Sequence, residues 1–113
     1  MSYSEWRNND GLLRKEWTNE AGSLHREDGP SRIYYYRDGS IEWEQFDIDG
    51  YLHRDSGPAQ ISYHPDGSIE YEAFHTAGEY LGTGKIGFWR LWEILDEEGR
   101  KAPGILKCLA RYS

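Results

Sequence analysis

The sequence predicts an all-β protein in which stacked β-hairpins form one antiparallel meander, a sheet whose neighbouring strands follow one another along the chain. Three observations predict this fold class. A 28-residue segment occurs twice, at residues 22–49 and 50–77, and 15 of its 28 positions are identical. Ordinary residue usage would give about one or two identities. Asp-Gly turn signals recur at the same place in each copy, and polar and apolar residues alternate around them.

Each copy opens with the loop pattern Gly-x-Leu-His-Arg-x-x-Gly-Pro and continues into two strand-like runs joined by Asp-Gly. Asp-Gly provides the positive-φ residues that tight hairpin turns require. The expected hairpins pair residues 31–36 with 41–46 and residues 59–64 with 69–74. Strict alternation predicts one apolar face, formed by Ile33, Tyr35, Ile41, Trp43, Ile61, Tyr63, Ile69 and Tyr71. The opposite, charged face would carry Arg32, Glu42, Glu44, Gln60, Glu70 and Glu72.

The pattern begins before the first full copy. An Asp-Gly pair at residues 10–11 stands one 28-residue period before the Asp-Gly of the first copy. Residues 10–21 are therefore predicted to be a degenerate half-repeat that contributes a strand over residues 12–18. The arm that pairs with this strand is expected over residues 3–7.

The last stretch, residues 78–113, departs from the pattern and is expected to form a divergent C-terminal cap. Its densest apolar segment, residues 85–95, fits two structures. A helix would present an apolar stripe formed by Phe88, Leu91, Trp92 and Leu95. A strand would keep the 28-residue phase, because Trp89 falls one period after Ile61. We predict the strand, followed by a short last strand or a helical turn over residues 105–112.

The chain is acidic and rich in aromatic residues. Its 113 residues carry a formal net charge of −7, and 15% of them are Phe, Trp or Tyr. Nucleic-acid-binding proteins usually carry a basic surface, so the negative net charge argues against nucleic acid as the partner. A negative net charge is compatible with a basic protein partner. The single cysteine, Cys108, excludes an intrachain disulfide, and no apolar run reaches membrane-spanning length. We therefore expect a cytoplasmic protein with one domain over residues 1–113, no membrane segment and no cofactor.

Short motifs recur in each loop and turn. Leu-His-Arg followed by Gly-Pro occurs at residues 24–30 and 52–58, and three Asp-Gly turns accompany it. This combination resembles the MORN-like repeats of small bacterial and phage proteins, including YwqK-type antitoxins. The resemblance covers about residues 10–78 and implies a sheet of stacked hairpins that acts as a binding scaffold. By analogy it also implies a role as an antitoxin or immunity protein.

The His-Arg pairs of the two loops are candidates for metal binding or catalysis. Equivalent residues of the two copies lie two strands apart, roughly 9–10 Å in a hairpin stack. Two imidazoles on one zinc must bring their nitrogens within about 4 Å, so the two loops cannot share a metal. We instead expect each His to bond loop backbone and each Arg to pair with a nearby carboxylate such as Glu27 or Asp55. These structural loop residues are His25, Arg26, His53 and Arg54.

Charged and aromatic residues of the sheet are the candidate partner-binding groups. The glutamates could act as general acids and bases, but a small meander offers no evident cleft for a substrate. Clustered carboxylates steer a basic partner, and exposed Tyr and Trp are typical of protein-binding hot spots. The candidates are Tyr34, Tyr36, Glu42, Glu44, Glu70, Glu72, Trp89 and Trp92.

The sequence therefore predicts a non-enzymatic protein-binding module that neutralises a partner protein. An antitoxin, an immunity protein or a phage anti-defence protein would fit this description. The second hypothesis is a structural or scaffold subunit that self-associates through the edges of its sheet. No catalytic residue, metal site or cofactor is predicted, because no set of residues in the sequence amounts to an active site. The fold class cannot supply one, since a fold alone does not imply an activity.

A zinc titration tests the structural assignment of the loop histidines. We expect isothermal titration calorimetry to show no stoichiometric tight site, because the two imidazoles cannot reach one ion. A single well-defined site that disappears in His25→Ala would contradict this expectation.

Overall fold

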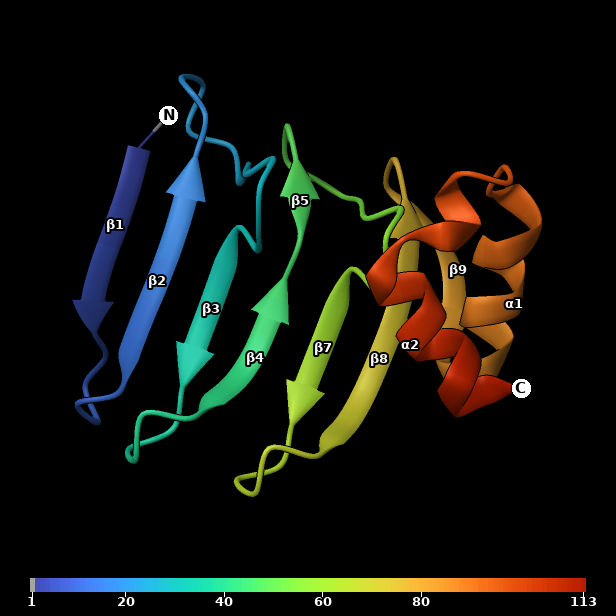
Figure 1. The fold of residues 1–113 in the computed structure, drawn as a ribbon. Helices are drawn as coiled ribbons and strands as arrows, with labels where there is room; N and C mark the ends of the chain where they lie inside the picture. Colours follow the sequence, from blue (N-terminus) through green and yellow to red (C-terminus); the bar gives the residue numbers. More distant parts are fainter. Residues whose placement is uncertain (1) are drawn as a thin grey trace.

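The computed structural model describes residues 2–113 as one seven-stranded antiparallel sheet with helices packed at one end (Figure 1). The strands lie in the order β1-β2-β3-β4-β7-β8-β9, so the predicted antiparallel meander is confirmed. Their bounds are β1 Ser2–Arg7, β2 Leu13–Thr18, β3 Arg32–Tyr35, β4 Ile41–Gln45, β7 Gln60–Tyr63, β8 Ile69–Thr76 and β9 Glu79–Thr83.

Five further elements complete the described chain. A two-stranded ribbon of β5 and β6 is inserted between β4 and β7, with bounds Asp47–Ile48 and Tyr51–Leu52. Three helical elements follow β9, namely α1 Gly84–Ile94, a 3-10 helix Gly99–Lys101 and α2 Pro103–Tyr112. Among residues 2–113, no helix combines the length and the apolar character needed to cross a membrane.

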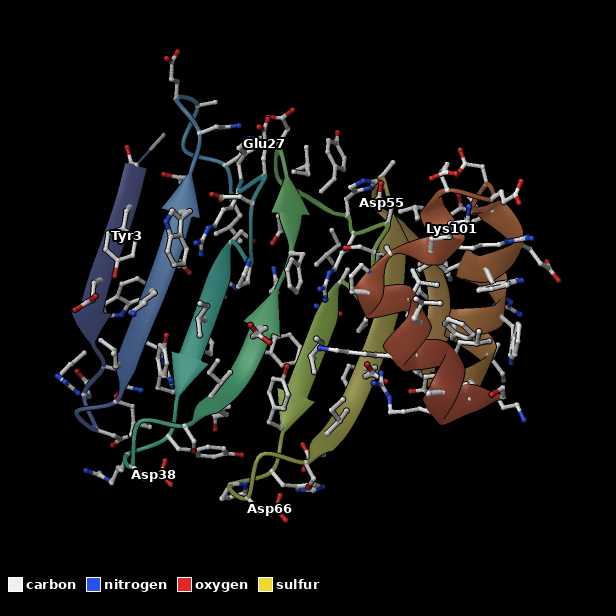
Figure 2. The ribbon with its side chains drawn as sticks, in the orientation of Figure 1. Tyr3, Glu27, Asp38, Asp55, Asp66 and Lys101 are labelled. Atoms are coloured by element: carbon white, nitrogen blue, oxygen red, sulfur yellow. The ribbon has the colours of Figure 1, made fainter. Side chains whose placement is uncertain are left out.

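The Asp-Gly turns lie where the sequence predicts them. Gly39 and Gly67 have φ angles of 90° and 89°, which favour glycine. In each turn the aspartate before the glycine accepts two hydrogen bonds from the serine after it, which lowers the pKa of Asp38 and of Asp66. These turns form one end of the sheet, whereas the loop that carries Asp55 lies at the opposite end (Figure 2).

Each of the two hairpins that follow the loops contains a β-bulge, where two residues of one strand oppose one residue of its partner. Beyond the Tyr34–Trp43 pair, Glu42 is left over as the extra residue of β4. The hairpin of β7 and β8 repeats this irregularity, with Glu70 as the extra residue. An extra residue reverses the alternation, so the side chains on either side of it exchange faces.

The bulges distribute side chains between the faces differently from strict alternation. Residues directly opposite each other on antiparallel strands share a face. One face, which we call the helix-covered face, contains in register Lys15, Ile33, Glu44, Ile61 and Glu72. The other, the open face, contains Trp6, Arg14, Tyr34, Trp43, Ser62 and Tyr71. The predicted separation into an apolar and a charged face is therefore wrong.

Residues 78–113 contain two α-helices, so the fold is mainly β rather than all-β, and the strand predicted over residues 85–95 is wrong. α1 instead buries one helical stripe that includes Gly87, Phe88 and Leu91. Gly82 and Gly84, with φ angles of 130° and 53°, turn the chain from β9 into this helix. A Cβ on Gly87 would lie 2.2 Å from the carbonyl oxygen of Gly82, so glycine permits the close approach. Amphipathic packing thus overrides the 28-residue phase.

α2 is the helical alternative of the two that the sequence left open for residues 105–112. It begins at Pro103, whose fixed φ suits the first helical position. Its buried residues, Ile105 and Cys108, lie on the side that faces the sheet and α1. The last turn therefore closes over the C-terminal end of the molecule rather than adding a strand.

The main hydrophobic core lies between the helices and the β8–β9 end of the sheet. It consists of Phe74, Leu81, Phe88, Leu91, Ile105 and Cys108. A buried carboxylate fixes α2 beside this core. The Glu72 side chain is 2% exposed and accepts hydrogen bonds from Arg111, at 2.7 Å, and from the Tyr112 hydroxyl. A carboxylate at this depth is stable because its charge is paired and bonded.

Valine at the hairpin turns tests the turn assignment. A Cβ added to Gly39 or Gly67 would meet no atom within 4 Å, so only backbone strain opposes a side chain there. We expect Gly39→Val and Gly67→Val each to lower the free energy of unfolding by more than about 1 kcal/mol. Urea denaturation measures the change. Gly39→Asn is the matched control and should lose less, because asparagine tolerates positive φ. Equal stability of all variants and the native chain would refute the turn.

Candidate functional site

A row of aromatic and arginine side chains crosses the open face of the sheet. The row comprises directly opposite residues of β1, β2, β3, β4, β7 and β8, namely Trp6, Arg14, Tyr34, Trp43, Ser62 and Tyr71. We call it the open-face row. Both α-helices pack on the other face, where they contact Phe74 and Glu72. The row is therefore not part of the main core.

Arginines hold the middle of the open-face row in place. The Arg14 guanidinium lies 4.3 Å from the centre of the Tyr34 ring and 3.7 Å from the Glu42 carboxylate. Arg32 lies 5.7 Å from the same ring and donates a hydrogen bond to Glu16 at 2.7 Å. Each cation on this part of the face is thus stacked on a ring and paired with an acid. Side chains that are already ordered lose less freedom when a partner binds.

The ends of the row are accessible and its centre is half-buried. Trp6 and Tyr71 are each 40% exposed, whereas Tyr34 and Trp43 are half-buried between their neighbours. Tryptophan, tyrosine and arginine are the residues most often found at protein-binding hot spots. The composition and the exposure of the row therefore match a protein-binding surface.

The four predicted glutamates do not form one acidic strip, because the bulges place them on opposite faces. Glu42 and Glu70 lie on the open face, where they contact an arginine and a serine of the row. Glu44 and Glu72 lie on the helix-covered face. Glu44 accepts a hydrogen bond from the Tyr63 hydroxyl at 2.6 Å, and Glu72 is bound by α2. Only two of the four can meet a partner on the open face.

Of the four predicted aromatic anchors, only Tyr34 belongs to the open-face row. Tyr36 follows β3 and donates its hydroxyl to the carbonyl oxygen of Tyr63 at 2.6 Å, which ties two hairpins together. Trp89 and Trp92 are partly buried and pack against the hydrophobic core. The structure therefore does not bring these four rings into one surface.

Sequence reasoning misses five of the six members of the row, which are Trp6, Arg14, Trp43, Ser62 and Tyr71. Strict alternation predicts Trp43 and Tyr71 on the apolar face, and no sequence signal marks the bulges that move them. Trp6 could have been found, because it stands one 28-residue period before Tyr34. Equivalent positions before equivalent turns lie on the same face.

The loop histidines bind backbone at the loop end of the sheet. Nδ1 of His25 accepts a hydrogen bond from the N–H of Asp49 at 3.0 Å, and Nδ1 of His53 accepts one from Ala77 at 2.9 Å. Asp49 and Ala77 have φ angles of 49° and 48°, which side-chain-bearing residues seldom adopt. Each histidine thus bonds the strained residue of a tight turn, in the same way in both copies.

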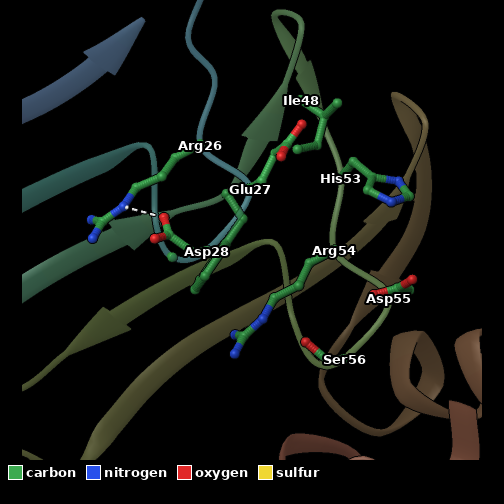
Figure 3. Close-up of a pocket in the computed structure, with 10 residues that line it drawn as sticks. Arg26, Glu27, Asp28, Ile48, His53, Arg54, Asp55 and Ser56 are labelled. Carbon is green, nitrogen blue, oxygen red and sulfur yellow. Dashed lines mark hydrogen bonds and ion pairs between the residues drawn. The ribbon is translucent and has the colours of Figure 1, made fainter. Parts of the chain in front are cut away.

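The loop arginines stack on aromatic rings beside a cavity of about 240 Å³ between the two loops (Figure 3). Arg26 lies 3.8 Å from the centre of the Trp17 ring, and Arg54 lies 3.9 Å from that of Phe46. The expected pairing with a nearby carboxylate holds for Arg26, although the partner is not Glu27, and it fails for Arg54. Arg26 pairs with Asp28 at 3.2 Å, and no carboxylate of residues 2–113 lies within 4.0 Å of Arg54.

Within residues 2–113, no cluster of three or more His, Cys, Asp or Glu side chains could hold a metal. Cys108 is buried, and this burial raises the pKa of its thiol, which disfavours the nucleophilic thiolate.

No protein-family model, curated protein or solved structure matches the chain. Its function is therefore inferred from the geometry of the chain itself, chiefly from the open-face row and the two loops.

His75 contributes a buried titratable group at the end of β8. It is 8% exposed, its ring lies 5.2 Å from that of Tyr80, and its Nδ1 has no hydrogen-bond partner among the described residues. Burial lowers the pKa of His75, and the nearby charge of Asp47 opposes this shift.

The lowered pKa of His75 predicts acid sensitivity. As the pH falls below about 6.5, the unfolded chain takes up a proton at this residue before the folded chain does. We expect the free energy of unfolding to decrease over this range and His75→Gln to reduce the decrease. Urea denaturation at neutral and mildly acidic pH measures both. His64→Gln is the comparison variant, because it makes the same substitution at an exposed histidine. The same pH dependence in His75→Gln as in the native chain would contradict the assignment.

Proposed function

We propose that the chain is a non-enzymatic protein-binding module that inhibits a partner protein by docking the open face of its sheet onto it. The observation that carries this proposal is the open-face row. It joins hot-spot residue types in one register on the face away from both helices. Its central charges are already paired within the chain, so docking does not leave a lone charge buried.

The dimensions of the row favour a protein as the partner. Six neighbouring strands span roughly 24 Å at the usual strand spacing. A surface of this width is comparable to one side of a standard protein–protein interface, whereas small-molecule sites are concave pockets. The net charge of −7 disfavours nucleic acid and favours encounter with a basic protein. Of the sequence candidates, Tyr34, Glu42 and Glu70 belong to this proposed interface.

The inhibitory role is part of the proposal. The resemblance of the loop and turn motifs to MORN-like repeats of YwqK-type antitoxins supports an antitoxin, an immunity protein or a phage anti-defence protein. The single cysteine, which is buried, supports a cytoplasmic location, where thiols stay reduced. A toxin or a defence protein is accordingly the proposed partner.

We also propose that the 28-residue copy is the structural unit of the sheet. Both copies support this by sharing a positive-φ glycine turn, a bulge after the turn, a backbone-binding histidine and a ring-stacked arginine. Residues 78–113 would then cap the stack, because repeat arrays need atypical ends.

Self-association through a sheet edge is the second candidate function, and β1 favours it. All of its residues, Ser2–Arg7, are exposed, and β2 is the only strand paired with it among the described residues. An edge strand without proline or a bulge is a template for another chain. A molecular mass that rises with protein concentration in sedimentation equilibrium would support this candidate, and a constant monomer mass would oppose it.

Affinity capture with matched variants tests the proposed interface. The double variant Trp6→Ala/Tyr71→Ala removes the accessible ends of the row, whereas Ile86→Ala removes an apolar side chain of α1 that is 64% exposed. We expect a partner that the native chain and Ile86→Ala both retain and that the double variant loses. Equal retention by all three would place the interface elsewhere.

Kinetic binding to the captured partner tests the centre of the row. Tyr34→Ala should raise the dissociation rate by about 30-fold and change the association rate little, as the loss of a central anchor does. The circular dichroism spectrum of each variant checks that the sheet is intact. An unchanged dissociation rate would remove Tyr34 from the interface.

A further inference from the structure

The two His-Arg loops hold their arginines in the same pose, so one loop serves as a reference for the other. The distances from guanidinium to ring centre are 3.8 Å for Arg26 and 3.9 Å for Arg54. In each loop Nη1 donates a hydrogen bond to a proline carbonyl, at 3.2 Å and 3.1 Å. A Cβ on the glycine three residues later would lie 3.0 Å and 3.1 Å from the guanidinium carbon. Because the two guanidinium groups have the same pose, any difference in their hydrogen-bond partners must come from the residues around them.

The loops differ in one acidic neighbour of the arginine. Asp28 of the first loop is replaced by Ser56 in the second, and Figure 3 shows the dashed contact of Arg26 with Asp28 and the serine near Arg54. Nε of Arg26 donates to the aspartate at 3.2 Å. Among the described residues, Arg54 donates a hydrogen bond only through Nη1. The edge of this guanidinium that carries Nε and Nη2 is thus free to bind an acceptor.

The nearest acidic side chains are already occupied. Glu44 and Glu72 act on Arg54 through their charge, yet neither lies within 4.0 Å of it. Glu44 accepts the Tyr63 hydroxyl, and Glu72 accepts Arg111 together with the hydroxyl of the last tyrosine. Burial lowers the pKa of Arg54, because the charged form has lost water. A cation in this situation favours an additional anion.

Arg54 lines a cleft of about 190 Å³ between the sheet and α2. The helix comes close because residue 104 is glycine, where a Cβ would lie 2.1 Å from the carbonyl oxygen of Ser56. The same Cβ position is 3.9 Å from Nη2 of Arg54. Lys107 and Arg111 line the same cleft. Arg111 is paired with Glu72, whereas Lys107 has no ion pair within residues 2–113. Three cations therefore face one carboxylate here, in a chain whose net charge is −7.

We propose that this cleft binds one carboxylate group, held by the Nε–Nη2 edge of Arg54 and by Lys107, in the place that Asp28 fills beside Arg26. A guanidinium edge matches the two oxygens of a carboxylate. The cleft is smaller than the roughly 300–1,000 Å³ of common ligand pockets, so the group belongs to a small acid or to an acidic side chain. The site lies on the helix-covered face and does not depend on the proposed function of the open face.

Nuclear magnetic resonance of the arginine Nε–H groups tests this site. Acetate and N-acetyl-aspartic acid amide are titrated separately into the native chain at constant ionic strength, with chloride as the balancing anion. We expect the Arg54 signal to shift and saturate while the Arg26 signal stays in place, because Asp28 occupies that guanidinium. Saturation by acetate identifies a small acid as sufficient. Saturation by the aspartate amide alone identifies an acidic side chain as the ligand.

Two variants make the test specific. Ser56→Asp supplies the missing carboxylate within the chain and should reduce the Arg54 response at least tenfold, while the rest of the spectrum stays folded. Lys107→Gln should weaken binding about two- to fivefold, as the loss of a solvent-accessible ion pair does. The proposal is overturned if neither acid saturates the Arg54 signal, if Arg26 responds equally, or if Ser56→Asp binds as the native chain does.

Discussion

The bulge after each Asp-Gly turn of the repeated segment determines what both faces of the sheet present. One extra residue in β4 and in β8 reverses the alternation of side chains. Trp43 and Tyr71 consequently join the open-face row, and Glu44 and Glu72 turn toward the helices. With strict alternation, the four glutamates would share one face and α2 would find no carboxylate beneath it. A single backbone irregularity thus places both the binding row and the anchor of the last helix.

Among residues 2–113, the helices pack on the β8–β9 end of the sheet, and the rest of the sheet is stabilised by different contacts. Aliphatic side chains are scarce, and cationic side chains cover the aromatic rings instead. Arg14 covers Tyr34, Lys15 covers Tyr35, and the two loop arginines cover Trp17 and Phe46. The long stems of these residues shield apolar surface while their charges stay near water. A face stabilised in this way remains partly exposed, which is what a docking surface needs.

The local features of the sheet could be predicted from the sequence, and the features that depend on packing could not. Asp-Gly turns and period-two runs located β3, β4, β7 and β8 to within two residues, because turn chemistry and alternation act over a few neighbours. The bulge at Glu42 escaped prediction because no sequence signal marks the extra residue. The helix at Gly84–Ile94 was one of two structures that fit the sequence, and the choice depends on packing against residues such as Phe74. The candidate site shows the same difference. Tyr34 was predicted as a binding residue, whereas Trp43 was not, because strict alternation places it on the opposite face.

The two copies show how a duplicated segment can keep its fold while its chemistry diverges. The histidine contacts, the ring-stacked arginines and the turns are the same in both, and they define the loop geometry. The position occupied by Asp28 and Ser56 can vary without disturbing that geometry, because the guanidinium pose depends on the ring and the proline carbonyl. Of the two loops, the second lies beneath α2. In the second loop, the absence of an aspartate therefore leaves the Arg54 guanidinium unpaired among the described residues, in an enclosed cleft. The same absence beside Arg26 would leave a guanidinium that is open to water.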